Sequence, residues 1–144
     1  MVVPSSPMRR KRILVVDDEP AIRILLRDAI SSPEIEIMMA EDALCALAVA
    51  EQNGPLELVV TDIYMPGMDG LELAQKLAAD RKAARFLFLS GYYDTQQFGE
   101  KLTGFPCSAF LEKPFSIPEL LRVVRKLLSQ GPTTADTGQS RAFA

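Results

Sequence analysis

Apolar and polar positions alternate in blocks along this chain. Five short apolar runs, rich in β-branched and aromatic residues, are separated by longer segments in which apolar residues recur at helical spacing. Runs that are apolar on consecutive positions are typical of strands buried on both faces of a parallel sheet. Because such strands alternate with helices, the pattern predicts an α/β fold. The expected strands are residues 13–16, 35–39, 58–61, 86–89 and 109–111.

The segments between the strands carry start signals of helices. Pro20 suits the first turn of a helix, and Asp42 can cap the next one. Asp69 and Ser116, each followed three residues later by Glu, resemble the starts of capping boxes. The apolar faces of these helices are expected to be Ile22, Leu25, Leu26 and Ala29; Leu44, Leu47 and Ala48; Leu73, Ala74, Leu77 and Ala78; and Leu120, Val123, Val124, Leu127 and Leu128.

One further helix, the fourth in chain order, is expected at residues 94–102. Only Phe98 and Leu102 pair at i,i+4 in this segment, and Gly99 interrupts it, so its intrinsic helix stability is low. Residues 131–144 are rich in Gly, Thr, Ser, Ala and Gln without periodicity. This composition predicts a disordered tail or a linker stub.

Carboxylates follow two of the predicted strands. Asp17 and Asp18 come directly after residues 13–16, and Asp62 comes directly after residues 58–61. The carboxyl ends of parallel strands share one edge of a sheet, and ligands bind at that edge. At ~4 Å and an effective dielectric constant of ~20, each pair of like charges costs about 4 kcal/mol, so a cation is expected. Oxygen ligands suit Mg²⁺ better than zinc, and the chain has no histidine.

Two more strand ends contribute polar groups. Ser90 follows residues 86–89, and Lys113 lies just beyond residues 109–111. A metal and a lysine neutralise phosphoryl oxygens, while a hydroxyl donates a hydrogen bond to them. Together with a carboxylate nucleophile, these groups predict phosphoryl transfer onto Asp62.

These motifs resemble the receiver domains of two-component response regulators. The similarity spans roughly residues 12–129. By this resemblance the fold is flavodoxin-like, with a doubly wound five-stranded parallel sheet of order 2-1-3-4-5 flanked by five helices. The resemblance also implies that a histidine kinase or a histidine phosphotransfer protein phosphorylates Asp62. The matching motifs are Asp17-Asp18-Glu19-Pro20, Asp62-Ile63-Tyr64-Met65-Pro66-Gly67, Ser90-Gly91 and Lys113-Pro114-Phe115.

The resemblance assigns further roles within the site. Asp18, Asp62 and the backbone carbonyl of Tyr64 would bind Mg²⁺, with Asp17 behind them. Ser90 and Lys113 would contact the phosphoryl group, and the Lys113–Pro114 peptide bond would be cis. Phe110 would be the aromatic switch. The face of helix 4, strand 5 and helix 5 would bind a downstream protein or a second copy of the chain.

Tyr64 and Tyr92 stand where receiver domains flank the path of water to the phosphoryl group. Both rings are bulky, where many relatives have small or polar residues. We therefore expect unusually slow autodephosphorylation. The alternative is that both rings point to solvent, as exposed tyrosines commonly do.

Each motif also has a purely structural interpretation when it is taken alone. Asp17 and Asp18 could cap a helix, Asp62 could belong to a turn, and Phe110 could be a core residue. Two other functions are open: a Mg²⁺-dependent phosphatase of the haloacid dehalogenase type, and a flavin-binding module. The first places its two carboxylates differently after the first strand, and carboxylates in the first loop would repel a flavin phosphate.

Composition limits the number of domains, the partners and the localisation that we expect. The 144 residues fit one domain, residues 12–130, after a basic N-terminal extension, residues 1–11, that is expected to be flexible. Residues 13–130 carry 11 Lys and Arg against 18 Asp and Glu, a net charge of −7, which argues against direct nucleic-acid binding. The chain shows no apolar stretch near 18 residues and no signal-peptide pattern, so we expect a cytoplasmic protein without membrane insertion.

The cysteine pattern suggests no metal site. Cys45 and Cys107 are expected to be reduced and structural, with Cys45 in a buried helix and Cys107 in a loop. Three arrangements fit a receiver of this length: a stand-alone regulator, the receiver of a hybrid kinase, or the first part of a longer regulator.

Overall fold

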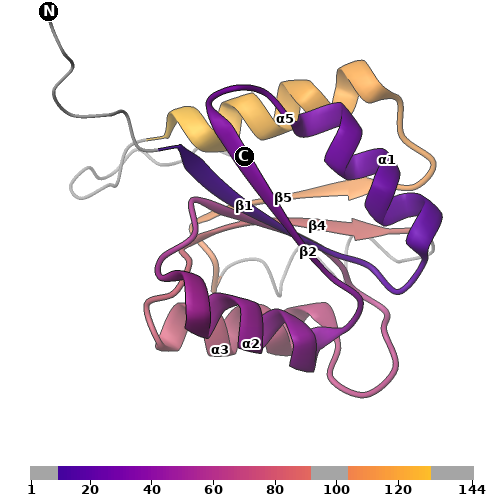
Figure 1. The fold of residues 1–144 in the computed structure, drawn as a ribbon. Coiled ribbons are helices and arrows are strands. Elements are labelled where there is room, and N and C mark those ends of the chain that lie inside the picture. Colours follow the sequence, from indigo (N-terminus) through magenta and orange to yellow (C-terminus); the bar gives the residue numbers. More distant parts are fainter. Residues whose placement is uncertain (1–9, 92–103, 131–144) are drawn as a thin grey trace, which may run out of the picture.

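A five-stranded parallel sheet forms the centre of the molecule (Figure 1). The computed structural model describes residues 10–91 and 104–130. The sheet order is β2-β1-β3-β4-β5, as the resemblance implied, and every neighbouring pair is parallel. The strands are β1 (Lys11–Val16), β2 (Ile35–Ala40), β3 (Leu58–Asp62), β4 (Arg85–Ser90) and β5 (Cys107–Glu112).

Helices cover both faces of this sheet. Within the described residues there are four: α1 (Pro20–Ile30), α2 (Ala43–Asn53), α3 (Gly70–Ala79) and α5 (Ile117–Ser129). Helices α1 and α5 lie on one face, and α2 and α3 lie on the other (Figure 1). The helix predicted at residues 94–102 lies outside the described residues.

The central strands are buried as the apolar runs predicted. Every residue of β3 is buried, and alternate side chains of each strand enter two separate apolar cores. Val59 and Phe86 point into the core under α2 and α3, whereas Val60 and Leu87 point into the core under α1 and α5. Burial on both faces explains why these strands lack the alternating polar positions of a half-exposed sheet.

The predicted helix caps are confirmed. The Asp42 side chain accepts a hydrogen bond from the Cys45 amide at the start of α2. Complete capping boxes begin α3 at Asp69 and α5 at Ser116. The N-cap of α1 is Glu19, whose side chain makes no capping hydrogen bond, so neither Asp17 nor Asp18 is the N-cap residue. The Asp17 carboxylate nevertheless accepts a hydrogen bond from the Glu19 amide at the start of this helix.

Some predicted helix faces are wrong. Leu44 is 72% exposed, Cys45 is exposed, and α2 instead buries Ala43, Ala46 and Ala50. This helix has apolar residues on every side, so their spacing does not define a single face, and small alanines allow a close approach to the sheet. The other positions expected in the core but found exposed are Leu25, Ala48 and Ala78.

Candidate functional site

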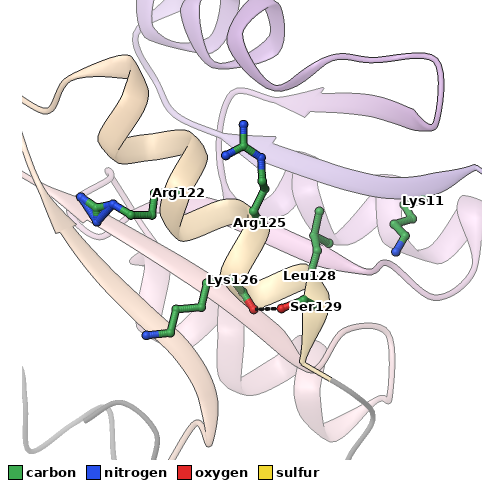
Figure 2. A pocket seen from close by; sticks show the side chains of 6 residues that line it. All are labelled: Lys11, Arg122, Arg125, Lys126, Leu128 and Ser129. Carbon is green, nitrogen blue, oxygen red and sulfur yellow. Dashed lines mark hydrogen bonds between the residues drawn. The ribbon is translucent and has the colours of Figure 1, made fainter.

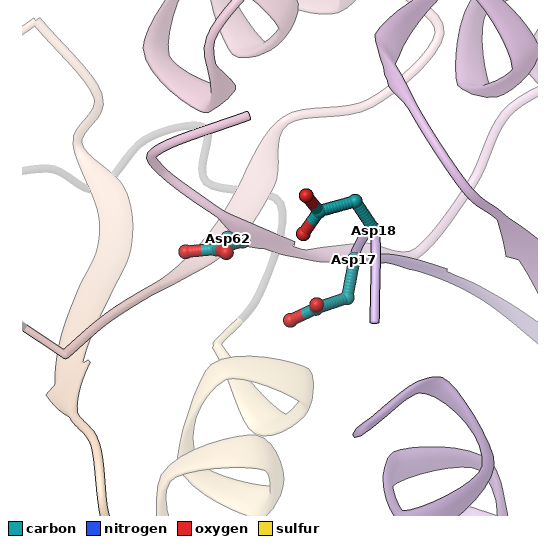
Figure 3. A group of neighbouring side chains, drawn as sticks. All are labelled: Asp17, Asp18 and Asp62. Atoms are coloured by element: carbon teal, nitrogen blue, oxygen red, sulfur yellow. The ribbon is translucent and has the colours of Figure 1, made fainter. Parts of the chain in front are cut away.

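Three carboxylates meet at the carboxyl edge of the sheet (Figure 3). Asp17 and Asp18 follow β1, and Asp62 is the last residue of β3. One carboxylate oxygen from each side chain lies within 4.8 Å of the other two. Asp17 is fully buried and Asp62 is 8% exposed, whereas Asp18 is exposed. The structure therefore brings together the three acidic residues that their positions at strand ends had predicted.

Lys113 reaches into this cluster from the end of β5. Its Nζ lies 3.2 Å from Asp17 Oδ2 and 3.5 Å from Asp62 Oδ2. Its backbone amide donates a 2.8 Å hydrogen bond to the Ser90 carbonyl, which fixes the end of β5 to the end of β4. The Lys113–Pro114 peptide bond is cis, as expected. A lysine that ends a buried strand needs an anionic partner, and Lys113 has two, Asp17 and Asp62.

The pKa values reflect crowded charges. Burial raises the pKa of Asp62, Lys113 lowers it and Asp17 raises it, and the net result is a pKa above the ordinary aspartate value. Burial lowers the pKa of Lys113, but Asp17 and Asp62 raise it by more, so it also ends above its ordinary value. One lysine thus faces three carboxylates, and the cluster keeps an excess of negative charge.

Asp17 is held by four groups. Its amide donates to the Ala40 carbonyl at 3.2 Å, and its Oδ1 accepts from the Glu19 amide at 2.9 Å. Arg23 Nη1 donates to the Asp17 carbonyl at 2.7 Å, and Lys113 bonds to Oδ2. Sequence reasoning missed Arg23, because a backbone carbonyl acceptor leaves no signal in the sequence. These contacts fix the direction in which the buried carboxylate points.

The backbone around Asp62 is equally constrained. The Ile63 amide donates to the Leu89 carbonyl at 2.9 Å, and the Gly70 amide donates to the Ile63 carbonyl at 2.8 Å. A Cβ atom on Gly70 would stand 2.2 Å from the Asp62 carbonyl oxygen. Only glycine therefore allows α3 to begin against the end of β3. A close approach of this kind between a glycine and a backbone carbonyl leaves no signal in the spacing of apolar and polar residues, so the sequence analysis did not single out Gly70.

The other predicted site residues differ in their surroundings. Ser90 is fully buried at the end of β4. Tyr64 is 54% exposed, and the half-buried Phe110 packs against the core under α2 and α3. Tyr92 lies outside the described residues. Ser90 and Lys113 thus reach the carboxylate edge through β4 and β5.

The donor set fits a hard divalent cation. All three clustered side chains offer carboxylate oxygens, and Mg²⁺ prefers oxygen ligands. The excess negative charge that Lys113 leaves uncompensated is what such a cation would neutralise. The exposed position of Asp18 leaves that side of the cluster open to solvent.

This fold and this arrangement of charges define the class of receiver domains. The family model of the response regulator receiver domain matches residues 13–125, and the chain belongs to this family. Receiver domains are phosphorylation-activated switches in two-component signalling. The comparisons give no support to a phosphatase of the haloacid dehalogenase type. No helix in the described part of the chain is long and apolar enough to cross a membrane.

Relatives agree with this assignment. The chain is 35% identical over 135 residues to the response regulator Rre1 of Synechocystis, covering 90% of this chain and 57% of the relative. It is 31% identical to the sporulation initiation phosphotransferase F of Bacillus subtilis, covering 84% of this chain and 96% of the relative. The chain spans about half the length of Rre1 and of the mycobacterial response regulator MprA.

A solved structure is similar in fold and in sequence. The response regulator protein TrrA of Thermotoga maritima, in complex with Mg²⁺ and BeF, superposes with a TM-score of 0.68 at 37% identity. The match covers 82% of this chain and 99% of TrrA.

Proposed function

We propose that Asp62 is the phosphoacceptor of this receiver domain. The observation that carries the proposal is the position of its carboxylate, 8% exposed at the end of β3, paired with Lys113 and within 4.8 Å of two other carboxylates. In the reaction an Asp62 oxygen forms a bond to phosphorus as the bond between phosphorus and the donor's imidazole nitrogen breaks. The imidazole leaves and the product is an acyl phosphate on Asp62.

Mg²⁺ would be held by Asp18, Asp62 and the backbone carbonyl of Tyr64, with Asp17 behind them. When bound, it supplies positive charge to the phosphoryl oxygens and to the carboxylates. The Asp17 carboxylate is already held in place by hydrogen bonds from the Glu19 amide and Lys113, so it would contribute a fixed negative charge behind the metal. The proposal of a Mg²⁺ site is supported by three clustered carboxylates whose charge one lysine does not neutralise.

Lys113 and Ser90 would hold the transferred group. The ammonium of Lys113 already lies 3.5 Å from Asp62 Oδ2, where it can pair with a phosphoryl oxygen. The hydroxyl of Ser90 would donate a hydrogen bond to another phosphoryl oxygen. Movement of Ser90 toward the phosphoryl group would shift the half-buried ring of Phe110 on β5 and so change the surface beyond it.

The output surface would comprise β5, α5 and the helix predicted at residues 94–102. A downstream protein or a second copy of the chain would bind there. A two-state change of this surface needs an element of low intrinsic stability, and the predicted helix with Gly99 in its middle has that property.

A sensor histidine kinase or a histidine phosphotransfer protein would donate the phosphoryl group, in the cytoplasm. Tyr64 would slow its loss, because a bulky side chain two residues after Asp62 can hinder the approach of water. Its 54% exposure is compatible with both this role and a purely solvent-facing ring, and kinetics must distinguish them.

Phosphorylation by a small donor tests the proposal. With acetyl phosphate and Mg²⁺, the intact mass of the protein should rise by one phosphoryl group, and EDTA should prevent this. Asp62→Asn should abolish the gain, whereas Asp80→Asn, an exposed carboxylate at the end of α3, should leave it unchanged. A gain that persists in Asp62→Asn, or steady turnover of p-nitrophenyl phosphate, would contradict the proposal.

A further inference from the structure

Asp18 is the least constrained of the three clustered carboxylates. The Asp17 carboxylate accepts hydrogen bonds from the Glu19 amide and from Lys113. Asp62 forms an ion pair with the same lysine. The carboxylate of Asp18, in contrast, makes no hydrogen bond or ion pair with any residue that the structure describes. It nevertheless extends toward Asp62, as the Asp17 carboxylate does (Figure 3). The direction of the Asp18 side chain therefore depends on the backbone that carries it.

The backbone between Asp17 and Asp18 is held by a side chain of α1. Arg23 Nη1 donates a 2.7 Å hydrogen bond to the carbonyl oxygen of Asp17. This carbonyl belongs to the peptide bond that joins Asp17 to Asp18. Because the donor is charged, the hydrogen bond is stronger than one between two neutral groups. Arg23 thus restricts rotation of the peptide unit from which Asp18 extends.

The stability of α1 does not explain the position of Arg23. This residue is the fourth of the helix, and the first turn of α1 contains no acidic residue. The amino end of a helix carries partial positive charge, so a cation there is unfavourable. Within the described part of the chain, Arg23 forms no ion pair, and its guanidinium bonds to the Asp17 carbonyl alone. The contact with the peptide unit before Asp18 is thus what accounts for a cation at this position.

We propose that Arg23 is a positioning residue for Mg²⁺, an inference that rests on the metal site proposed above. By holding the peptide unit between Asp17 and Asp18, Arg23 keeps the Asp18 carboxylate near those of Asp17 and Asp62. One oxygen of each of these carboxylates lies within 4.8 Å of the other two, which is where the ion would bind. Groups that hold a metal ligand in place commonly contribute about 10- to 100-fold to the affinity for the metal. Arg23 acts through Asp18 and needs no contact with the ion.

The charge of Arg23 has the opposite effect on metal binding. A guanidinium near the carboxylates repels a divalent cation, so removing its charge alone would tighten the binding of Mg²⁺. Removing its hydrogen bond would weaken the binding, because the Asp18 carboxylate would then sample directions that do not face the ion. The sign of the change in Kd therefore distinguishes positioning from charge. A purely structural role of Arg23 predicts a lower stability of the metal-free chain with an unchanged Kd.

Thermal unfolding of the full chain at increasing Mg²⁺ concentration, without a phosphodonor, tests the proposal. The rise in stability with Mg²⁺ gives Kd, and unfolding in EDTA gives the stability of the metal-free chain. Arg23→Met keeps an aliphatic stem without the guanidinium and should raise Kd about tenfold or more. Arg23→Lys keeps a charged donor and should recover part of the affinity. In EDTA, the Glu19 amide, which bonds to Asp17 Oδ1, should exchange its hydrogen faster in Arg23→Met than in the wild-type chain.

Two control variants each remove one positive charge without changing a contact of Asp17 or Asp18. Arg27→Met alters the next turn of α1, where the side chain of Arg27 pairs with the exposed Asp28. Arg125→Met alters the other end of the molecule, because Arg125 of α5 and Lys11 of β1 line the same open hollow (Figure 2). Strand β1 separates Lys11 from the carboxylate edge by roughly 20 Å, at about 3.3 Å per residue. Both controls should bind Mg²⁺ like the wild-type chain.

An unchanged or lower Kd in Arg23→Met, or an equal rise of Kd in Arg27→Met, would overturn the proposal. Arg23→Gln, a shorter and neutral side chain, is a second variant from which the same rise of Kd is expected, so the test does not depend on the folding of Arg23→Met. A wild-type chain that does not respond to Mg²⁺ would refute the metal site and this inference together. If the wild-type chain responds and the Arg23 variants respond equally, the positioning role alone is wrong.

Discussion

Replacing Lys113 by Met tests the electrostatics of the site without removing the aliphatic stem. The substitution leaves the buried Asp17 and Asp62 carboxylates without the ammonium that lies 3.2 and 3.5 Å away. At an effective dielectric constant of ~20, each of these attractions is worth about 5 kcal/mol before desolvation is counted. Removing one partner of a buried ion pair costs about 3–5 kcal/mol in total.

The lower end of that range is expected here. The Lys113 side chain is 20% exposed and that of Asp62 is 12% exposed, so water weakens both pairs. A loss of about 3 kcal/mol at pH 7 corresponds to a fall in Tm of roughly 10 °C for a domain of this size. Lys76→Met is the control, because Lys76 is exposed on α3 and surface substitutions usually stay within about 0.5 kcal/mol.

Thermal and urea unfolding in EDTA measure the difference in stability between the Lys113→Met variant and the wild-type chain. The pH dependence of that difference identifies its cause. The folded pKa of Asp62 lies above its unfolded value, so ionisation of Asp62 disfavours the folded state, and stability is regained as pH falls through the folded pKa. The Lys113→Met variant should therefore recover part of its loss toward pH 5. If its Tm falls no further than that of Lys76→Met, or if acid does not restore it, the proposed charge balance is wrong.

Three further predictions concern the metal, the phosphoryl lifetime and the switch. Mg²⁺ at 100 times its Kd should raise the free energy of unfolding of the wild-type chain by about 2.7 kcal/mol and so raise its Tm. Asp18→Asn should lose this gain, and an unchanged response would place the cation elsewhere. Tyr64→Asn should speed autodephosphorylation, about tenfold for each ~1.4 kcal/mol removed from the barrier, and equal decay rates would show that the ring faces solvent. Beryllofluoride with Mg²⁺ should alter hydrogen exchange in β5 around Phe110, and unaltered exchange there would disprove the coupling.

The strand ends could be predicted because two independent signals agree. Residues 13–16 and 58–61 are apolar on consecutive positions, and each is followed at once by carboxylates. In a parallel sheet that order alone brings Asp17, Asp18 and Asp62 to one edge. Lys113 could be added because a lysine after a buried strand requires an anionic partner.

Other features could not be predicted, for physical reasons. The buried face of α2 is made of small alanines, and Leu44 is exposed, because close packing against the sheet outweighed hydrophobicity at each position. The Arg23 contact to the Asp17 carbonyl depends on backbone geometry that no residue type encodes.

The phosphorylation of Asp62 is tested most directly by reductive trapping. Borohydride converts an aspartyl phosphate to homoserine, which peptide mass spectrometry can locate after treatment with acetyl phosphate and Mg²⁺. Homoserine at position 62, and at no other aspartate of the chain, is the predicted result. Homoserine at Asp17 or Asp18, or phosphorylated protein in which Asp62 survives unmodified, would contradict the assignment.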